Sequence, residues 1–184
     1  MASTATERKS HAGRPVVVTL TDILPTLRGS LPDPLDRTRW PAETLATVDD
    51  VAVQGLSLAR TARLLGTPLV FRPAAGDPVG VVALTVSGVT AGPEARRVLC
   101  GRTRLSSTVC VCGDEMCWYE ARLVGRVSVT HRRPATLVAC GAERTVDLPV
   151  DLGPGDVIAI PVRMSPTAPG GCRLLDRIED SPGH

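Results

Sequence analysis

Residues 48–71 read VDDVAVQGLSLARTARLLGTPLVF, and two periodicities follow one another within this stretch. Residues 48–53 are rich in Val and predict a short strand, and Gly55 marks a tight turn after it. Apolar side chains then recur at helical spacing over residues 57–65, where Gly66 is a stop signal. This stretch therefore predicts a strand, a turn and one amphipathic helix.

A second strand should follow the helix, beginning after Pro68. We expect a βαβ-like unit in which the helix turns Leu58, Ala62 and Leu65 toward a sheet, because these positions share one helical face.

Short runs of Val, Leu, Ala and Thr recur between turn signals in the rest of the chain. Partial alternation in residues 81–87 indicates a strand with one buried face. Regular spacing without helical periodicity predicts a mainly β fold: an antiparallel β-barrel or sandwich with one or two short helices near the N-terminus. The expected strands cover 79–87, 96–100, 105–112, 117–130, 135–140, 144–150 and 156–163.

The length of 184 residues is enough for one core, so we expect one domain. Residues 1–15 are polar and aperiodic and read as a disordered arm, and residues 16–184 as a single β-barrel domain. Residues 31–41 contain three prolines and predict a surface loop pinned by Trp40, whose ring N–H needs a hydrogen-bond partner.

Two stretches resemble fold type III pyridoxal-phosphate (PLP) amino-acid decarboxylases, the family of diaminopimelate and ornithine decarboxylases. Residues 65–70 (LGTPLV) are similar to the "F-G-T-P-x-Y-V" segment before the cofactor-bearing barrel of that family. Residues 148–158 (LPVDLGPGDVI) are similar to its "L-P-x-x-L-x-x-G-D-L-L" run in the late strands of the C-terminal β domain. The acidic tail, residues 172–180, is similar to the family's closing strand. The resemblance implies a β-barrel domain of this kind.

The chain has no room for the family's (β/α)₈ barrel between these stretches, and residues 72–80 stand where it would be. Of the 21 basic residues 20 are Arg, and the one lysine, Lys9, lies in the N-terminal arm. A Schiff-base lysine must be fixed and desolvated beside its cofactor. We therefore expect no covalent PLP and no catalysis by the chain alone.

Composition argues against two classes of partner. A net charge of +2 with scattered arginines and only four aromatic residues offers no basic stripe and no stacking platform for nucleic acid. No apolar run reaches the ~20 residues of a membrane span, and the N-terminus lacks signal-peptide order. We expect a cytoplasmic protein that binds neither nucleic acid nor membrane; the excess of Arg over Lys points to a GC-rich bacterial genome.

Four of the six cysteines cluster in sequence, and three of them, Cys110, Cys112 and Cys117, surround a predicted turn. Thiolates brought together at a turn are typical of structural zinc, although free cysteines are more often packed in a core. The fourth zinc ligand stays open between Cys100, Cys140 and His131. We expect packed or interface thiols and no cofactor, with zinc as the alternative.

The resemblance implies a further reading, because the family's β domain carries a Cys-Glu-Ser-x-Asp turn that reaches the partner subunit's active site. The segment from Cys110 to Asp114 retains its Cys and Asp, and the segment from Cys140 to Glu143 is the competitor. Both depart from the pattern. These four residues are the candidates for substrate contact.

The sequence thus favours a non-catalytic accessory or regulatory subunit, a pseudoenzyme that pairs with itself or with a full-length decarboxylase-like enzyme. The alternative is a small enzyme with a cysteine- or zinc-dependent site at residues 110–117.

Overall fold

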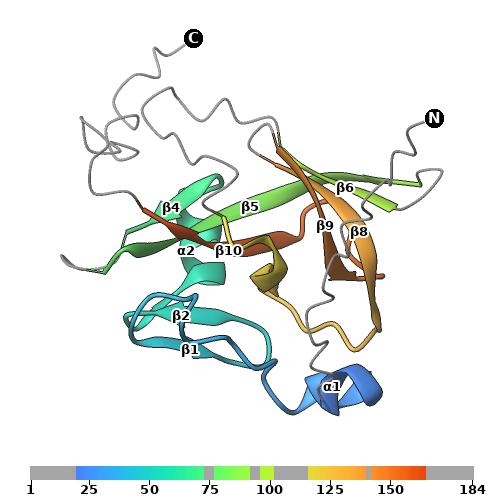
Figure 1. The fold of residues 1–184 in the computed structure, drawn as a ribbon, viewed down its shortest axis with the longest axis horizontal. Coiled ribbons are helices and arrows are strands. Elements are labelled where there is room, and N and C mark those ends of the chain that lie inside the picture. The colour runs from blue at the N-terminus through green and yellow to red at the C-terminus, as the bar shows by residue number, and fades with distance from the viewer. Residues whose placement is uncertain (1–19, 73–76, 92–95, 102–115, 140–141, 165–184) are drawn as a thin grey trace, which may run out of the picture.

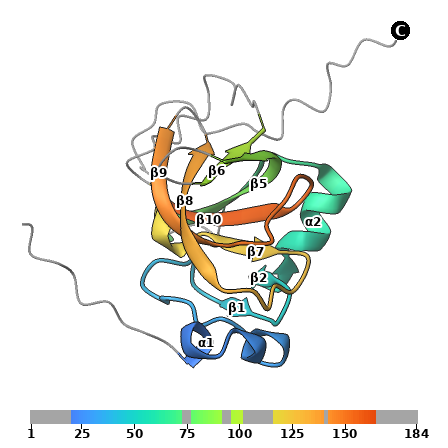
Figure 2. The ribbon, with the colours of Figure 1, turned by 90° about the vertical axis from the view of Figure 1, so that its right-hand side faces the viewer.

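The computed structural model describes residues 20–72, 77–91, 96–101, 116–139 and 142–164. A small sheet lies against a larger, strongly curled sheet, with α2 beside both (Figures 1 and 2). The mainly β prediction is confirmed. Within these residues no helix is long and apolar enough to cross a membrane.

The first elements are α1 (Leu20–Ile23), η1 (Pro25–Gly29), β1 (Thr44–Ala46), β2 (Val51–Val53), β3 (Leu56–Ser57) and α2 (Leu58–Leu65). The larger sheet contains β4 (Leu69–Phe71), β5 (Val79–Thr90), β6 (Arg96–Cys100), β7 (Arg122–Val124), β8 (Arg132–Ala139), β9 (Ala142–Pro149) and β10 (Val157–Arg163). The helical turn η3 (Trp118–Glu120) precedes β7.

The centre of the larger sheet is β5, in the order β7-β10-β5-β6-β8-β9. Its first half pairs with β10 on one edge and with β4 on the other, and its second half pairs with β6 beyond a register shift between Val86 and Gly88. Such a shift bends the strand and increases its twist, which helps the sheet to curl. The pairs are antiparallel except β6 and β8, which run parallel.

The strand β5 has a hydrophobic core on each face. Val82 and Val86 belong to the core inside the curl of the larger sheet, together with side chains of β6, β8, β9 and β10. Val81 belongs to a second core with Leu58 of α2 and Val53 of β2. Residues 81–87 were expected to bury one face, and this expectation is wrong: both faces are buried, because α2 and the small sheet cover the second one.

The helix α2 forms where the sequence predicts it. Ser57 is its N-cap and accepts a hydrogen bond from Arg60 N–H at 3.0 Å. Leu58 and Ala62 are buried as expected, but the prediction for Leu65 is wrong, since this side chain is 62% exposed at the last residue of the helix.

The expected βαβ unit is also wrong. The residues before the helix form an antiparallel hairpin, in which β2 pairs with β1 and β3, and the strand after the helix, β4, joins the other sheet. Gln54 and Gly55 both have positive φ, 50° and 78°, so they close the two-residue turn between β2 and β3.

Residues 117–130 were expected to be a strand, and most of this segment is not. Apart from the three residues of β7, it consists of η3 and a loop. Gly125 has a φ of 93° and its N–H donates to Asp49 O at 2.7 Å, so the backbone leaves the sheet to contact the turn between β1 and β2.

The capping of α2 can be tested by Ser57→Ala. Ser57 Oγ donates to the Asp50 carboxylate, which also accepts from Ala59 N–H at 3.0 Å. Loss of the cap should lower the free energy of unfolding by about 1 kcal/mol in urea denaturation. The control is Ser87→Ala, an exposed serine on β5. Equal stability losses in the two variants would contradict the assignment.

Candidate functional site

The cysteine candidates are placed only in part. Cys110, Cys112, Asp114 and Cys140 lie outside the described residues. Cys117 carries a half-buried free thiol, and its backbone N–H donates to Pro161 O at 2.8 Å. In the described part of the chain, no three His, Cys, Asp or Glu side chains come together in a group that could hold a metal ion.

The remaining sequence candidates lie apart from one another. Cys100 is buried in the core inside the curl. Glu143 is exposed on β9 and forms an ion pair with Arg97 at 2.7 Å, which joins β9 to β6 across β8. His131 is exposed in the turn before β8. None of these three lines the pocket described next.

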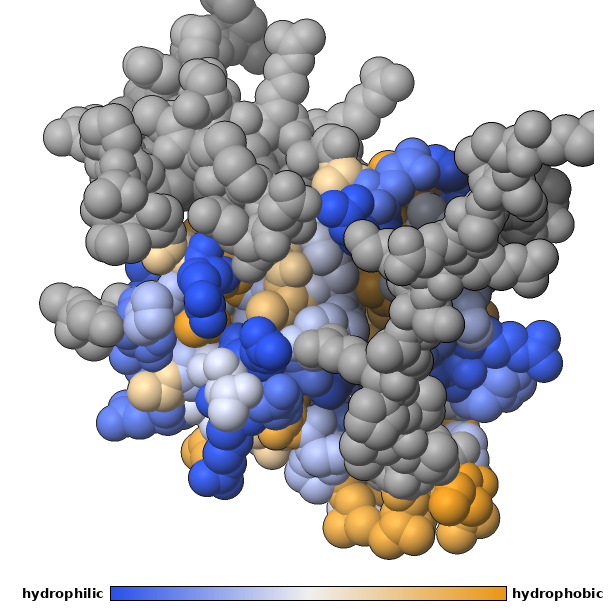
Figure 3. All heavy atoms as spheres, viewed as in Figure 1, coloured by the Kyte–Doolittle hydropathy of each residue, from blue (hydrophilic) through white to orange (hydrophobic). Residues whose placement is uncertain are grey.

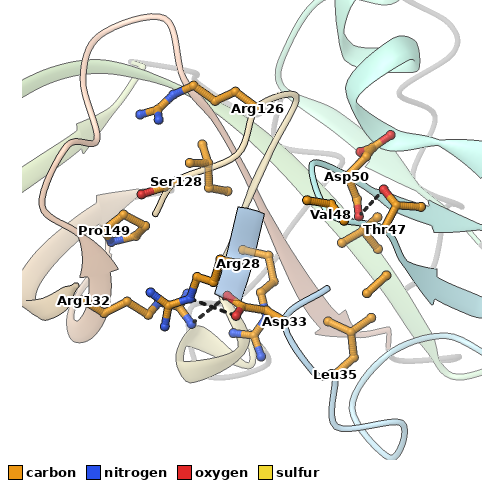
Figure 4. Close-up of a pocket in the computed structure, with 14 residues that line it drawn as sticks. Arg28, Asp33, Leu35, Thr47, Val48, Asp50, Arg126, Ser128, Arg132 and Pro149 are labelled. Atoms are coloured by element: carbon orange, nitrogen blue, oxygen red, sulfur yellow. Dashed lines mark hydrogen bonds and ion pairs between the residues drawn. The ribbon is translucent and has the colours of Figure 1, made fainter. Parts of the chain in front are cut away.

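A pocket with a cavity volume of about 50 Å³ opens between the N-terminal segment, the turn between β1 and β2, and residues 122–132 (Figure 4). Its charged lining consists of four arginines and two aspartates: Arg28, Arg122, Arg126, Arg132, Asp33 and Asp50. The rest of the lining consists of the apolar residues Leu35, Ala46, Val48, Val51, Leu123 and Pro149 and the hydroxyl residues Thr47 and Ser128.

On one wall, Arg28 and Arg132 share the carboxylate of Asp33 (Figure 4). Arg28 Nε donates to Asp33 Oδ1 at 2.9 Å, and Arg132 Nη1 lies 3.9 Å from Asp33 Oδ2. Arg28 Nη1 also donates to Thr130 O at 2.9 Å, so this nearly buried guanidinium ties η1 to the loop before β8.

Arg122 of the pocket lining pairs with a buried carboxylate, Glu120. It accepts hydrogen bonds from the Trp40 ring N–H at 2.9 Å and from Arg122 Nη2 at 3.0 Å. Arg122 Nη2 also donates to Pro34 O at 3.0 Å. The expectation that residues 31–41 form a loop pinned by Trp40 is confirmed, and Glu120 is the partner of the ring N–H.

At the other end of the pocket, the guanidinium of Arg126 uses all five of its N–H groups. They donate to both carboxylate oxygens of Asp156, to the carboxylate and backbone oxygens of Asp151, and to Val127 O. The hydrogen bonds to Asp156 contribute most to raising the pKa of Arg126. Asp156 also accepts from Gly153 N–H at 2.8 Å, so this cluster fixes the Gly-Pro-Gly-Asp turn before β10.

The arginine-lined pocket was missed by sequence reasoning. Its arginines come from η1, β7, β8 and a loop, more than 100 positions apart at the extremes, and no local spacing unites them. The sequence feature that could have led to this region was Trp40, because its buried ring N–H needs a hydrogen-bond acceptor from a distant part of the chain.

No protein-family model matches this chain, and no curated protein is similar enough to it to count as a relative.

The carboxylate of Asp151 makes stability depend on pH. Burial raises its pKa, but hydrogen bonds from Ser128, Arg126 and Thr130 outweigh that effect, so the pKa lies below its usual value. A lowered pKa contributes stability that is fully present above the unfolded value near ~3.9 and is lost as pH falls through the folded value. Urea denaturation from pH 6 to pH 3 should therefore show a smaller loss for Asp151→Asn than for the wild type. The control Asp147→Asn, at an exposed position on β9, should follow the wild type; equal slopes for all three proteins would contradict this prediction.

If the cysteines are packed or interface thiols, as we expect, the protein should contain no stoichiometric zinc and a chelator should leave its Tm unchanged. Cys117→Ala and Cys112→Ala should each cost on the order of 1 kcal/mol, as small buried truncations do. One equivalent of zinc per chain in elemental analysis, released by either substitution, would replace this reading with the metal site.

Proposed function

We propose that this protein is a non-catalytic accessory subunit related to the β domain of fold type III PLP decarboxylases. It pairs with a second copy or with a full-length decarboxylase-like enzyme in the cytoplasm. The observation that carries the proposal is the way in which residues 48–71 and 144–162 pack as one unit.

These two stretches meet at β5, although about 70 residues separate them in sequence. Ala83 of β5 lies opposite Leu69 of β4 on one edge and opposite Ala159 of β10 on the other. Leu58 of α2 packs in the same core as Ala159. Segments inherited from one ancestral domain would be expected to share a core in this way.

The connection from β4 to β5 supports the same origin. Phe71 at the end of β4 pairs with Val81 near the start of β5, so the two strands form an antiparallel pair joined by residues 72–78. In the decarboxylase family the cofactor-bearing barrel begins at this point. The chain here returns directly to the sheet, as it would after loss of the barrel.

Exposed apolar side chains provide a surface for pairing. Leu64 and Leu65, at the end of α2, are 72% and 62% exposed and precede β4 by a few residues. A second apolar group surrounds α1, visible as the orange area at the lower right of Figure 3; it includes Leu20 and Ile23. We assign the pairing surface to Leu64 and Leu65, because they adjoin the strand that would lead into the lost barrel.

The pairing is tested by mixing the protein with the fold type III decarboxylase of its own organism. Light scattering should show a complex or a homo-oligomer, and a complex should change kcat/KM of the enzyme. Leu64→Asp combined with Leu65→Asp should abolish the association, because it charges the contact. A monomer at high concentration that has no effect on the enzyme would overturn the proposal.

The matched control is Leu45→Asp combined with Leu56→Asp, two leucines of the small sheet that are 62% and 53% exposed. This variant should associate like the wild type. Reduction with borohydride in the presence of PLP should add no mass outside the N-terminal arm that holds Lys9. A stoichiometric adduct on a folded segment would remove the non-catalytic assignment.

A further inference from the structure

The outer face of α2 combines positive charge with apolar side chains. Arg60, Arg63 and Leu64 lie at i, i+3 and i+4, so they share one face of the helix, and Leu65 borders that face. All four side chains are exposed, and the buried residues of α2 lie on the other side of the helix. Figure 2 shows α2 at the right-hand edge of the molecule. This face is therefore open to a partner.

No carboxylate in the described part of the chain neutralises the two arginines. None of the ion pairs among the described residues involves Arg60 or Arg63. Asp50, at the N-terminus of α2, accepts hydrogen bonds from Ser57 Oγ and Ala59 N–H instead. The sequence shows the same imbalance, because residues 51–76 contain three arginines and no Asp or Glu. This segment carries a charge of +3 in a chain whose net charge is +2.

The stability of the helix accounts for one of these arginines but not for the other. Arg63 lies in the last turn of α2, where a cation interacts favourably with the helix dipole. Ser57 is the N-cap, so Arg60 occupies the third helical position, where the dipole and the capping box favour an acidic side chain. A carboxylate supplied from outside would offset the unfavourable position of Arg60.

A second copy of the chain does not suit this surface. In an isologous dimer the same patch lies on both sides of the contact, so Arg60 and Arg63 would face their own copies. Like charges that face each other across an interface weaken it. An anionic membrane does not suit the surface either, because α2 has eight residues and exposes two leucines, which is little apolar surface to insert.

We propose that the outer face of α2 binds an acidic amphipathic segment of a partner protein other than a second copy of this chain. The apolar side chains of that segment cover Leu64 and Leu65, and its Asp or Glu residues pair with Arg60 and Arg63. Complementary charge of this kind selects the partner more than it adds affinity. The inference rests on the proposed function, because it names the chemistry of the partner at the pairing surface of Leu64 and Leu65.

The experiment titrates the full chain with three synthetic helical peptides of about 15 residues, a length at which helices begin to form. The peptides share one leucine face and carry Glu, Gln or Lys on the polar face. In two-dimensional NMR, the Glu peptide should give saturable shifts at α2 and bind at least about tenfold more tightly than the Gln peptide, and the Lys peptide should not bind. Added salt should weaken the Glu peptide, because exposed ion pairs are screened.

Arg60→Glu combined with Arg63→Glu should reverse the preference, so that the Lys peptide binds and the Glu peptide does not. The variant should stay folded by circular dichroism, because Glu at position 60 suits the capping box. The matched control is Arg37→Glu combined with Arg133→Glu, two exposed arginines outside α2 whose replacement changes the net charge equally. This control should bind the peptides like the wild type. Equal Kd values for the Glu and Gln peptides, or an unchanged preference in the α2 variant, would overturn the proposal.

Two further measurements separate this inference from the proposed function. A homodimer in light scattering that Leu64→Asp combined with Leu65→Asp dissociates would overturn the inference and leave the proposed pairing intact. Binding to phosphatidylglycerol vesicles without binding to the Glu peptide would also overturn it, in favour of a membrane. A preference for the Glu peptide would support the inference even if the decarboxylase of the same organism formed no complex, so the two proposals can fail separately.

Discussion

The structure depends on the pairing of β5 with β10. Seven register pairs, from Thr85 opposite Val157 to Val79 opposite Arg163, join two strands whose side chains are buried on both faces. One face closes the core inside the curled sheet and the other holds α2 and the small sheet. Both layers would lose their support without this ladder, because each core takes part of its apolar surface from the same two strands.

The core contains few aromatic residues, and polar contacts supplement its apolar packing. The N-terminal segment packs Trp40 and Leu35 into the core on the outer face of β5, and guanidinium groups add hydrogen bonds to the larger sheet, as Arg28 does with Thr130 O and Arg122 with Pro34 O. Such bonds are directional, whereas apolar contacts between Val, Ala and Leu are not. The arginines therefore add directional contacts to a loop that Trp40 already anchors in the core.

Local sequence patterns predicted much of the fold, but they did not predict the pocket, whose residues come from distant parts of the sequence. The helix α2 and the strands β6, β8, β9 and β10 follow from short-range periodicity and turn residues, and the buried partner of Trp40 follows from one ring N–H. The β1–β2–β3 hairpins and the exposure of Leu65 are local features that the periodicity of residues 48–66 does not determine. The parallel β6–β8 pair depends on which distant strands meet. The grouping of Arg28, Arg122 and Arg132 does so even more, because it joins a helical turn, a strand and a second strand that share no sequence spacing. The residues of the cysteine turn lie outside the described part of the chain, so that reading stays a prediction.

The short return from β4 to β5 has a consequence for how this chain tolerates change. The two strands are hydrogen-bonded neighbours, so the chain leaves and re-enters the sheet at adjacent positions. A long insertion between two such points adds little closure entropy, about 0.6 kcal/mol for each doubling of loop length, and leaves the ladder intact. A whole independently folding unit could be gained or lost there while the remaining sheet keeps its register, because the two ends of such a unit often lie close together.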